Sequence, residues 1–176
     1  GCQPVGSPGG ENDTKRNVQQ VKLIEMLRLD KLLFDAIVAD EELMQAVGGR
    51  VKSTCYEVAP DKDDNTPLPY IIVIDEGKAP AQTTKDDEWM PSQWRVGAGV
   101  EIGAKSPNEV DELMMKAMKA IATHIAVLSI HSGDLPYLNE GFPQTQGIQW
   151  DWTKPCYWDI AHYQCDIDYI DDDEQD

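Results

Sequence analysis

The clearest pattern of hydrophobic and polar positions runs from Gln93 to Ile102 and alternates strictly. Apolar or aromatic side chains occupy every second position, and polar residues or glycines occupy the positions between them. The apolar series is Trp94, Val96, Ala98, Val100 and Ile102. A period of two is typical of a strand with one buried face. We therefore expect a strand here and expect Trp94 to belong to the core.

The period changes directly after this strand. The stretch Ser106-Pro107-Asn108-Glu109 predicts a helix start, with Ser106 as N-cap, Pro107 at the first helical position and Glu109 placed to reach back to the cap. Apolar residues then recur at helical spacing from Val110 to Leu128. A long amphipathic helix that follows a strand at once must lie back on its sheet, which is an α+β arrangement.

Two helices and a strand are expected earlier in the chain. The apolar stripe from Thr14 to Val38 predicts a helix. A short second helix begins at its cap Asp40 and ends at Gly48-Gly49. Arg50 to Val58 predicts the first strand. Residues 1–13 contain Gly, Pro and Ser without an apolar period, which indicates a flexible lead-in.

Three more strands complete the prediction. Tyr70–Ile74 is apolar on both faces, as a central strand would be, and loops are expected at residues 77–92 and 131–147. Residues 148–153 alternate and predict a fourth strand. The last strand, 157–169, has Tyr163 on its inner face, with Asp159 and His162 expected on the outer one.

These elements predict one α+β domain over residues 14–170. We expect a mainly antiparallel sheet of four to five strands packed against a long helix, with an N-terminal helical segment. The chain closes on the acidic run at residues 171–176, which is most simply a solvated tail.

Charge narrows the class of function. The 176 residues carry a formal charge of −17, and so acidic a surface repels nucleic-acid phosphate and anionic lipid. A sequence-reading DNA binder is therefore not expected. Apolar runs fall well short of the ~20 residues that a membrane-spanning helix needs.

Candidate chemistry is sparse in the sequence. Gly97, Gly99 and Gly103 lack the spacing of a dinucleotide-binding loop and are expected to thin one sheet face where another backbone comes close. The three histidines are scattered, and the cysteines form no C-x-x-C pair. Cys55 and Cys165 are interpreted as small core residues, with a disulfide as the alternative. We expect no catalytic residues, no metal and no cofactor, so this is not expected to be an enzyme.

Aromatic residues give the sequence its candidate interfaces. Trp150 and Trp152 share one face of their strand, and Trp158 has the opposite parity from Tyr163. A strand with bulky residues on both faces is expected to have both faces covered, either inside one core or with one face against another molecule. Both interpretations remain open at this stage. The interface candidates from the whole chain are Trp89, Met90, Leu135, Tyr137, Phe142 and Trp158.

Five segments share their order and local sequence with a known family. They are Leu32–Arg50, Pro67–Val73, Trp94–Ile102, Ser106–Ala120 and Tyr163–Tyr169. Together they resemble the tail-completion or tail-terminator proteins of long-tailed phages and prophages. In that family a short helix ends in a Gly-Gly-Arg element, a "pLPyivv" strand follows, a further strand enters a long helix, and a last strand closes the sheet. The amino-terminal extension and the 131–147 loop are longer than the family pattern.

The resemblance implies a structural role in the virion. Such proteins form a ring, typically a hexamer, on the end of the tail tube, and they contact tail-tube and head-connector proteins after assembly in the bacterial cytoplasm. DNA would pass through the ring without specific binding, and part of the negative charge would line that channel. The channel candidates are Asp166, Asp168 and residues 171–176.

The dipeptide Gly1-Cys2 supplies an alternative. It could be the remnant of a bacterial lipoprotein processing site, in which Cys2 carries lipid. The chain would then be a lipid-anchored protein-binding module of the cell envelope, and membrane association would depend on Cys2.

Overall fold

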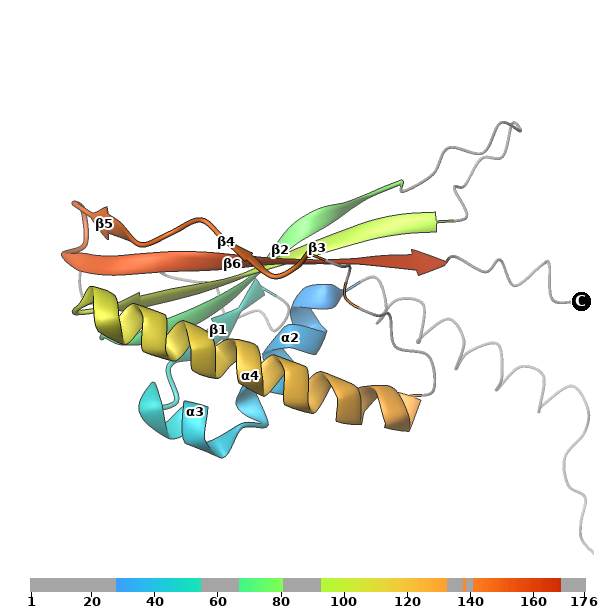
Figure 1. Cartoon of the computed structure of the whole chain (residues 1–176), viewed down its shortest axis with the longest axis horizontal. Coiled ribbons are helices and arrows are strands. Elements are labelled where there is room, and N and C mark those ends of the chain that lie inside the picture. Colours follow the sequence, from blue (N-terminus) through green and yellow to red (C-terminus); the bar gives the residue numbers. More distant parts are fainter. Residues whose placement is uncertain (1–27, 55–66, 81–92, 133–137, 139–140, 169–176) are drawn as a thin grey trace, which may run out of the picture.

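The structure is a computed structural model that describes residues 28–54, 67–80, 93–132, 138 and 141–168. The described residues form two layers, with a twisted sheet on one side and the helices on the other (Figure 1). The described elements are α2 (Leu29–Val38), α3 (Glu41–Ala46), β1 (Val51–Ser53), β2 (Tyr70–Pro80), β3 (Gln93–Ala104), α4 (Pro107–Ser132), β4 (Gln144–Thr145), β5 (Gln149–Asp151) and β6 (Cys156–Asp168). The predicted α+β class is confirmed.

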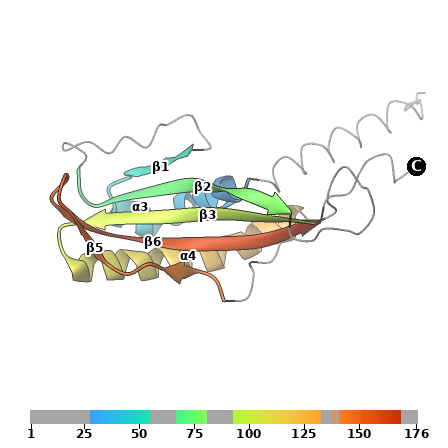
Figure 2. The same cartoon turned by 90° about the horizontal axis from the view of Figure 1, so that it is seen from above.

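The sheet is mixed but mostly antiparallel. Its strand order is β1-β2-β3-β6-β4, and β5 pairs with the start of β6. β1 runs parallel to β2, and every other pair is antiparallel. Figure 2 shows the long strands β2, β3 and β6 side by side with the helices behind them. The six described strands exceed the four to five expected, because the stretch predicted as a loop contains the two-residue strand β4.

The core lies between the helices and the inner face of the sheet. Val96, Val100 and Ile102 of β3 point into it and are buried, as the alternation predicts. α4 contributes Leu113 and Ile121, and α2 contributes its own apolar stripe. We call the other side of the sheet, away from the helices, the far face.

Both predicted helix caps are present. The Ser106 hydroxyl oxygen accepts a hydrogen bond from the Glu109 amide at 3.2 Å, and the Asp40 carboxylate accepts one from the Leu43 amide at 2.9 Å. After α3, Gly48 and Gly49 have φ angles of 59° and 73°, the left-handed conformation that ends a helix. The sequence signals therefore set where α3 begins and ends and where α4 begins.

Three local predictions are wrong. β2 continues through Gly77 to Pro80, where a loop was expected, because a bulge at Glu76 lets the strand keep pairing with β3. Trp94 is only half-buried and lies outside the core, near the start of β3.

Asp159 was expected on the outer face, but strict alternation along β6 turns it inward opposite Ile102. There it is buried and accepts a hydrogen bond from the Gly147 amide at 3.0 Å.

Other predictions are met only over the part of the chain that the structure describes. α2 covers the last part of the predicted helix 14–38, and β1 covers three residues of the predicted strand at 50–58. The lead-in 1–13, the acidic tail 171–176, Cys2 and Cys55 lie outside the described residues.

The far face is closed at one end by side chains that fill the space above a glycine. Gly103 leaves room for the ring of Tyr70, and a Cβ at this position would overlap that ring. The Tyr70 hydroxyl donates a hydrogen bond to the buried Glu101 carboxylate at 3.0 Å. The Lys154 ammonium lies 4.9 Å from the Tyr70 ring centroid. Burial, together with Glu101, raises the pKa of Tyr70 well above its usual range.

The glycines of β3 thus make room on the far face for side chains, whereas the sequence analysis expected the close approach of another backbone. Above Gly99, a Cβ would lie 2.8 Å from the Ile160 side chain and 3.1 Å from the Glu76 carboxylate. Gly97 differs, because its nearest neighbour would be Glu76 Cβ at an ordinary 3.5 Å. Gly97 is the position of the three that accepts a side chain.

This difference gives a test with a matched pair of variants. Gly103→Ala should lower the free energy of unfolding by about 1–3 kcal/mol, because the new methyl overlaps the Tyr70 ring and forces the strands to shift. Gly97→Ala should be neutral or stabilising by up to about 1 kcal/mol, because alanine loses less backbone entropy on folding. Urea denaturation of both variants measures the difference, and equal effects at the two sites would contradict the packing described here.

Candidate functional site

Two surface features stand out among the described residues, and the first is aromatic. Trp150 is 38% exposed and Trp152 is 87% exposed. The two indole rings meet edge to face with centroids 6.1 Å apart, and Trp150 packs against Tyr157 at 4.7 Å. We call Trp150, Trp152 and Tyr157 the aromatic edge. It lies where β5 turns into β6, at one end of the sheet (Figure 1).

The turn that carries Trp152 is held on both sides. Asp151 Oδ1 accepts hydrogen bonds from the Thr153 amide at 3.0 Å, the Thr153 hydroxyl at 2.7 Å and the Lys154 amide at 3.2 Å. Lys154 itself is 5% exposed and lies against the Tyr70 ring. The backbone around Trp152 is therefore fixed, and its indole projects into solvent from a defined position.

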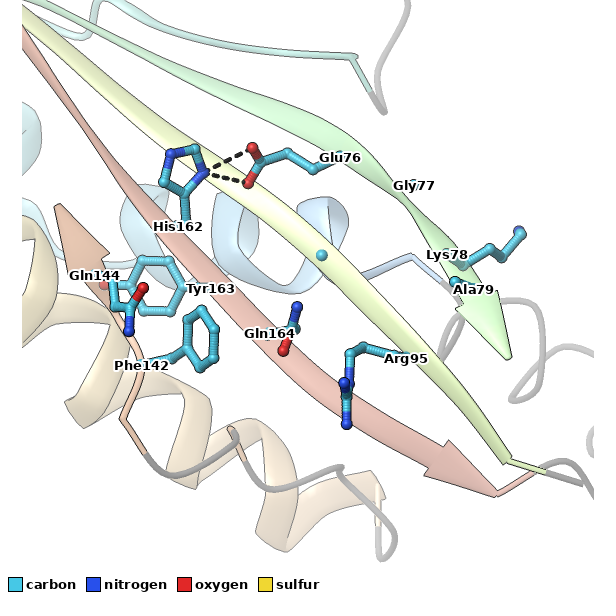
Figure 3. Close-up of a pocket in the computed structure, with 11 residues that line it drawn as sticks. Glu76, Gly77, Lys78, Ala79, Arg95, Phe142, Gln144, His162, Tyr163 and Gln164 are labelled. Carbon is cyan, nitrogen blue, oxygen red and sulfur yellow. Dashed lines mark hydrogen bonds and ion pairs between the residues drawn. The ribbon is translucent and has the colours of Figure 1, made fainter. Parts of the chain in front are cut away.

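The second feature is a hollow of about 430 Å³ on the far face. We call it the sheet hollow (Figure 3). It crosses four strands, and its floor includes Gly97, where β3 carries no side chain. Its remaining lining residues are Glu76, Gly77, Lys78, Ala79, Arg95, Phe142, Gln144, His162, Tyr163 and Gln164.

Charges around the sheet hollow are arranged in pairs. His162 Nδ1 lies 2.7 Å from Glu76 Oε2, because the β2 bulge turns Glu76 over Gly99 toward β6. The Arg95 guanidinium lies 3.0 Å from Asp166, and that hydrogen bond raises the pKa of Arg95. Pairing leaves the hollow polar but close to neutral.

The buried thiols are not suited to reaction. Cys156 and Cys165 are both fully buried. Burial, followed by the nearby Asp166 charge, raises the pKa of Cys165 to about 12, so its thiol stays protonated at neutral pH. Within the described ranges no three His, Cys, Asp or Glu side chains gather as a metal site would require. No helix among these residues has the length and apolar character to cross a membrane.

The predicted interface residues fall into three groups. Trp89, Met90, Leu135 and Tyr137 lie outside the described residues. Phe142 is half-buried and lines the sheet hollow. Trp158 is half-buried on the far face, paired with Gly103. The hollow unites Phe142 with residues that were not among the predicted interface candidates.

Sequence reasoning did not select Trp152. Its alternation with Trp150 suggested a continuous strand, whereas β5 ends at Asp151 and Trp152 begins a turn. The signal was present in the neighbouring residues, because Asp151 is a typical turn former and Pro155 excludes a central strand.

The channel candidates are also partly outside the described residues. Asp166 is on the far face, and its carboxylate is bound by Arg95 at 3.0 and 3.4 Å. Residues 171–176 and the side chain of Asp168 are not described. The channel assignment stays a prediction.

Comparison with known proteins gives a distant structural likeness. A solved structure of the bacteriophage SPP1 gp17 protein has a TM-score of 0.46 with this chain at 14% sequence identity, over 82% of this chain and 92% of that one. No protein-family model matches the chain, and no curated protein sequence does. A likeness at this level establishes neither a shared family nor a shared function.

The buried Cys165 thiol predicts how stability changes in alkali. Its pKa is raised from 9.0 to about 12 on folding, so the stabilisation is fully present below pH 9 and is lost as the pH rises toward 12. Over that window one such group lowers the free energy of unfolding by about 1.4 kcal/mol per pH unit. Cys165→Ala should be less stable at pH 8, because of the cavity, but should lose stability less steeply above pH 9. Urea denaturation at several pH values measures both slopes, and parallel curves would contradict the assignment.

Proposed function

We propose that this chain is a structural subunit of a long-tailed phage, a tail-completion or tail-terminator protein that assembles as a ring, caps the tail tube and meets the head connector. It acts through docking surfaces and catalyses no reaction. Its support is the sequence resemblance together with the way two of the matching segments contact each other. These are Gly48-Gly49-Arg50 and Pro67–Val73.

The observation that carries the proposal is the contact made by Arg50. This residue ends the Gly48-Gly49-Arg50 element after α3, and its guanidinium donates hydrogen bonds to the carbonyl oxygens of Pro69 at 2.8 Å and Leu68 at 3.2 Å. The Arg50 carbonyl in turn accepts a hydrogen bond from the Ile71 amide at 3.0 Å. The two family-like segments, distant in sequence, are thus parts of one structural unit. Chance similarity in two unrelated loops would not require such a contact.

The order of the remaining elements agrees with the resemblance. β3 enters α4 after two residues, and β6 closes the sheet beside β3. A subunit in a closed ring needs two different contact surfaces, one for each neighbour. The aromatic edge and the sheet hollow are two such surfaces. The formal charge of −17 would keep passing DNA from adhering to the ring.

Tube termination tests this function directly. The purified chain should shorten tubes formed by the tail-tube protein encoded beside it, because a capped end cannot add subunits. Negative-stain electron microscopy measures the length distribution and should show a ring at one end of each tube. An unrelated protein of similar size and acidity is the control.

Unchanged tube lengths with bare ends, at chain concentrations above that of tube ends, would contradict the proposal. So would a gene neighbourhood that lacks tail-tube and head-connector genes.

A further inference from the structure

We propose that Trp152 of one copy of this chain docks into the sheet hollow of the next copy. This contact would be the heterologous interface of the assembly, so it deepens the proposed function and rests on its ring. Four observations lead to it: the exposure of Trp152, the rigidity of its turn, the shape of the hollow and the distance between the two.

Trp152 has the properties of an interface anchor. At 87% exposed it leaves nearly all of a large aromatic surface in water. Tryptophan is among the residue types that contribute most of the binding energy in protein–protein interfaces. Asp151 and Lys154 hold its turn on both sides, so little further backbone ordering is needed on docking. Trp150 widens the aromatic surface beside it.

The sheet hollow has the size and chemistry to receive an indole. Its volume of about 430 Å³ falls within the ~300–1,000 Å³ of pockets that hold small organic molecules. Gly97 leaves the floor open, and Phe142 supplies an aromatic wall (Figure 3). Arg95, whose guanidinium is also bound by Asp166 at 3.0 Å, is an exposed cation on the lining, and a cation near an indole face is attracted to it.

The two surfaces cannot meet within one chain. Asp151 pairs with Cys156 at the start of β6, while His162 and Gln164 of the hollow lie six and eight residues further along the same strand. At ~3.4 Å per residue this is a separation of roughly 20–27 Å along a rigid strand. Only a Trp152 from another copy can reach the hollow.

Such a contact joins unlike surfaces, which fixes the type of assembly. Each copy offers one Trp152 and one hollow, so every subunit can bind a neighbour on either side and the chain of contacts closes into a ring if the rotation permits. The copies repel each other, since each carries a charge of −17. Added salt should therefore strengthen association, because it screens the repulsion while leaving the apolar contact in place.

Three variants separate this contact from other forms of association. Trp152→Ala removes the anchor and leaves the hollow intact. Gly97→Leu fills the hollow and leaves the anchor intact, and a Cβ at Gly97 meets its nearest neighbour at an ordinary 3.5 Å. Met115→Ala is the matched control, because Met115 is a 65% exposed apolar residue on α4. Thermal unfolding confirms that each variant is folded before association is measured.

Sedimentation equilibrium over a concentration series is the measurement. The wild type and Met115→Ala should associate equally, and Trp152→Ala and Gly97→Leu should each weaken association by roughly 30-fold or more, the effect of losing an interface anchor. An equimolar mixture of Trp152→Ala and Gly97→Leu should form dimers and nothing larger. One intact anchor then meets one intact hollow, and no further site remains.

Three outcomes would overturn the proposal. They are association of Trp152→Ala at wild-type strength, a mixture of the two defective variants that stays monomeric while Met115→Ala associates, and a wild type that is monomeric at every concentration and salt level. The tube-length assay reads out the proposed function separately. If Trp152→Ala still caps tubes as a ring, this docking contact is refuted while the function stands. If the predicted association pattern holds but the wild type leaves tube lengths unchanged, the contact stands and the function fails.

Discussion

Burial of one face of β3 beneath α4 and α2 is the interaction on which the rest of this structure depends. β3 is the strand between β2 and β6, and it passes into α4 with only two residues between them. Val96, Val100 and Ile102 fill the inner face, so the register of both neighbouring strands is tied to a single hydrophobic series. A shift of one residue would carry that series into water.

The far face follows from the same alternation. The positions between the apolar residues of β3 include Gly97, Gly99 and Gly103, and what lies above each glycine differs. Tyr70 fills the space over Gly103 and closes that end of the sheet with Glu101 and Lys154. Little stands over Gly97, and a hollow results. The glycines of one strand thus determine that the far face is filled by side chains at the Gly103 end and hollow at the Gly97 end.

The fold was largely predictable from sequence because its signals are local. The two N-caps, the paired glycines after α3 and the alternation of β3 each depend on a few neighbouring residues. Asp159 was an error of local pattern, because the alternation of β6 itself turns this residue inward. The other errors arose where tertiary contacts decide. The bulge at Glu76 extends β2 beyond its apolar run, and nothing in Glu76-Gly77 alone distinguishes a bulge from a turn. The hollow was not predictable at all, since it needs residues of four strands whose pairing becomes known only in three dimensions. Trp152 is an intermediate case. Its alternation with Trp150 predicted a strand, but the neighbouring turn-forming residues end β5 at Asp151.

The carboxylate of Asp151 has a consequence for recognition that reaches beyond its own turn. By accepting three hydrogen bonds it removes the torsional freedom of the backbone that follows it. That loss of entropy occurs when the protein folds, and it need not occur again when a partner arrives. In the proposed contact, discrimination between partners would then depend on their shape, because the backbone that carries the indole is already fixed before docking.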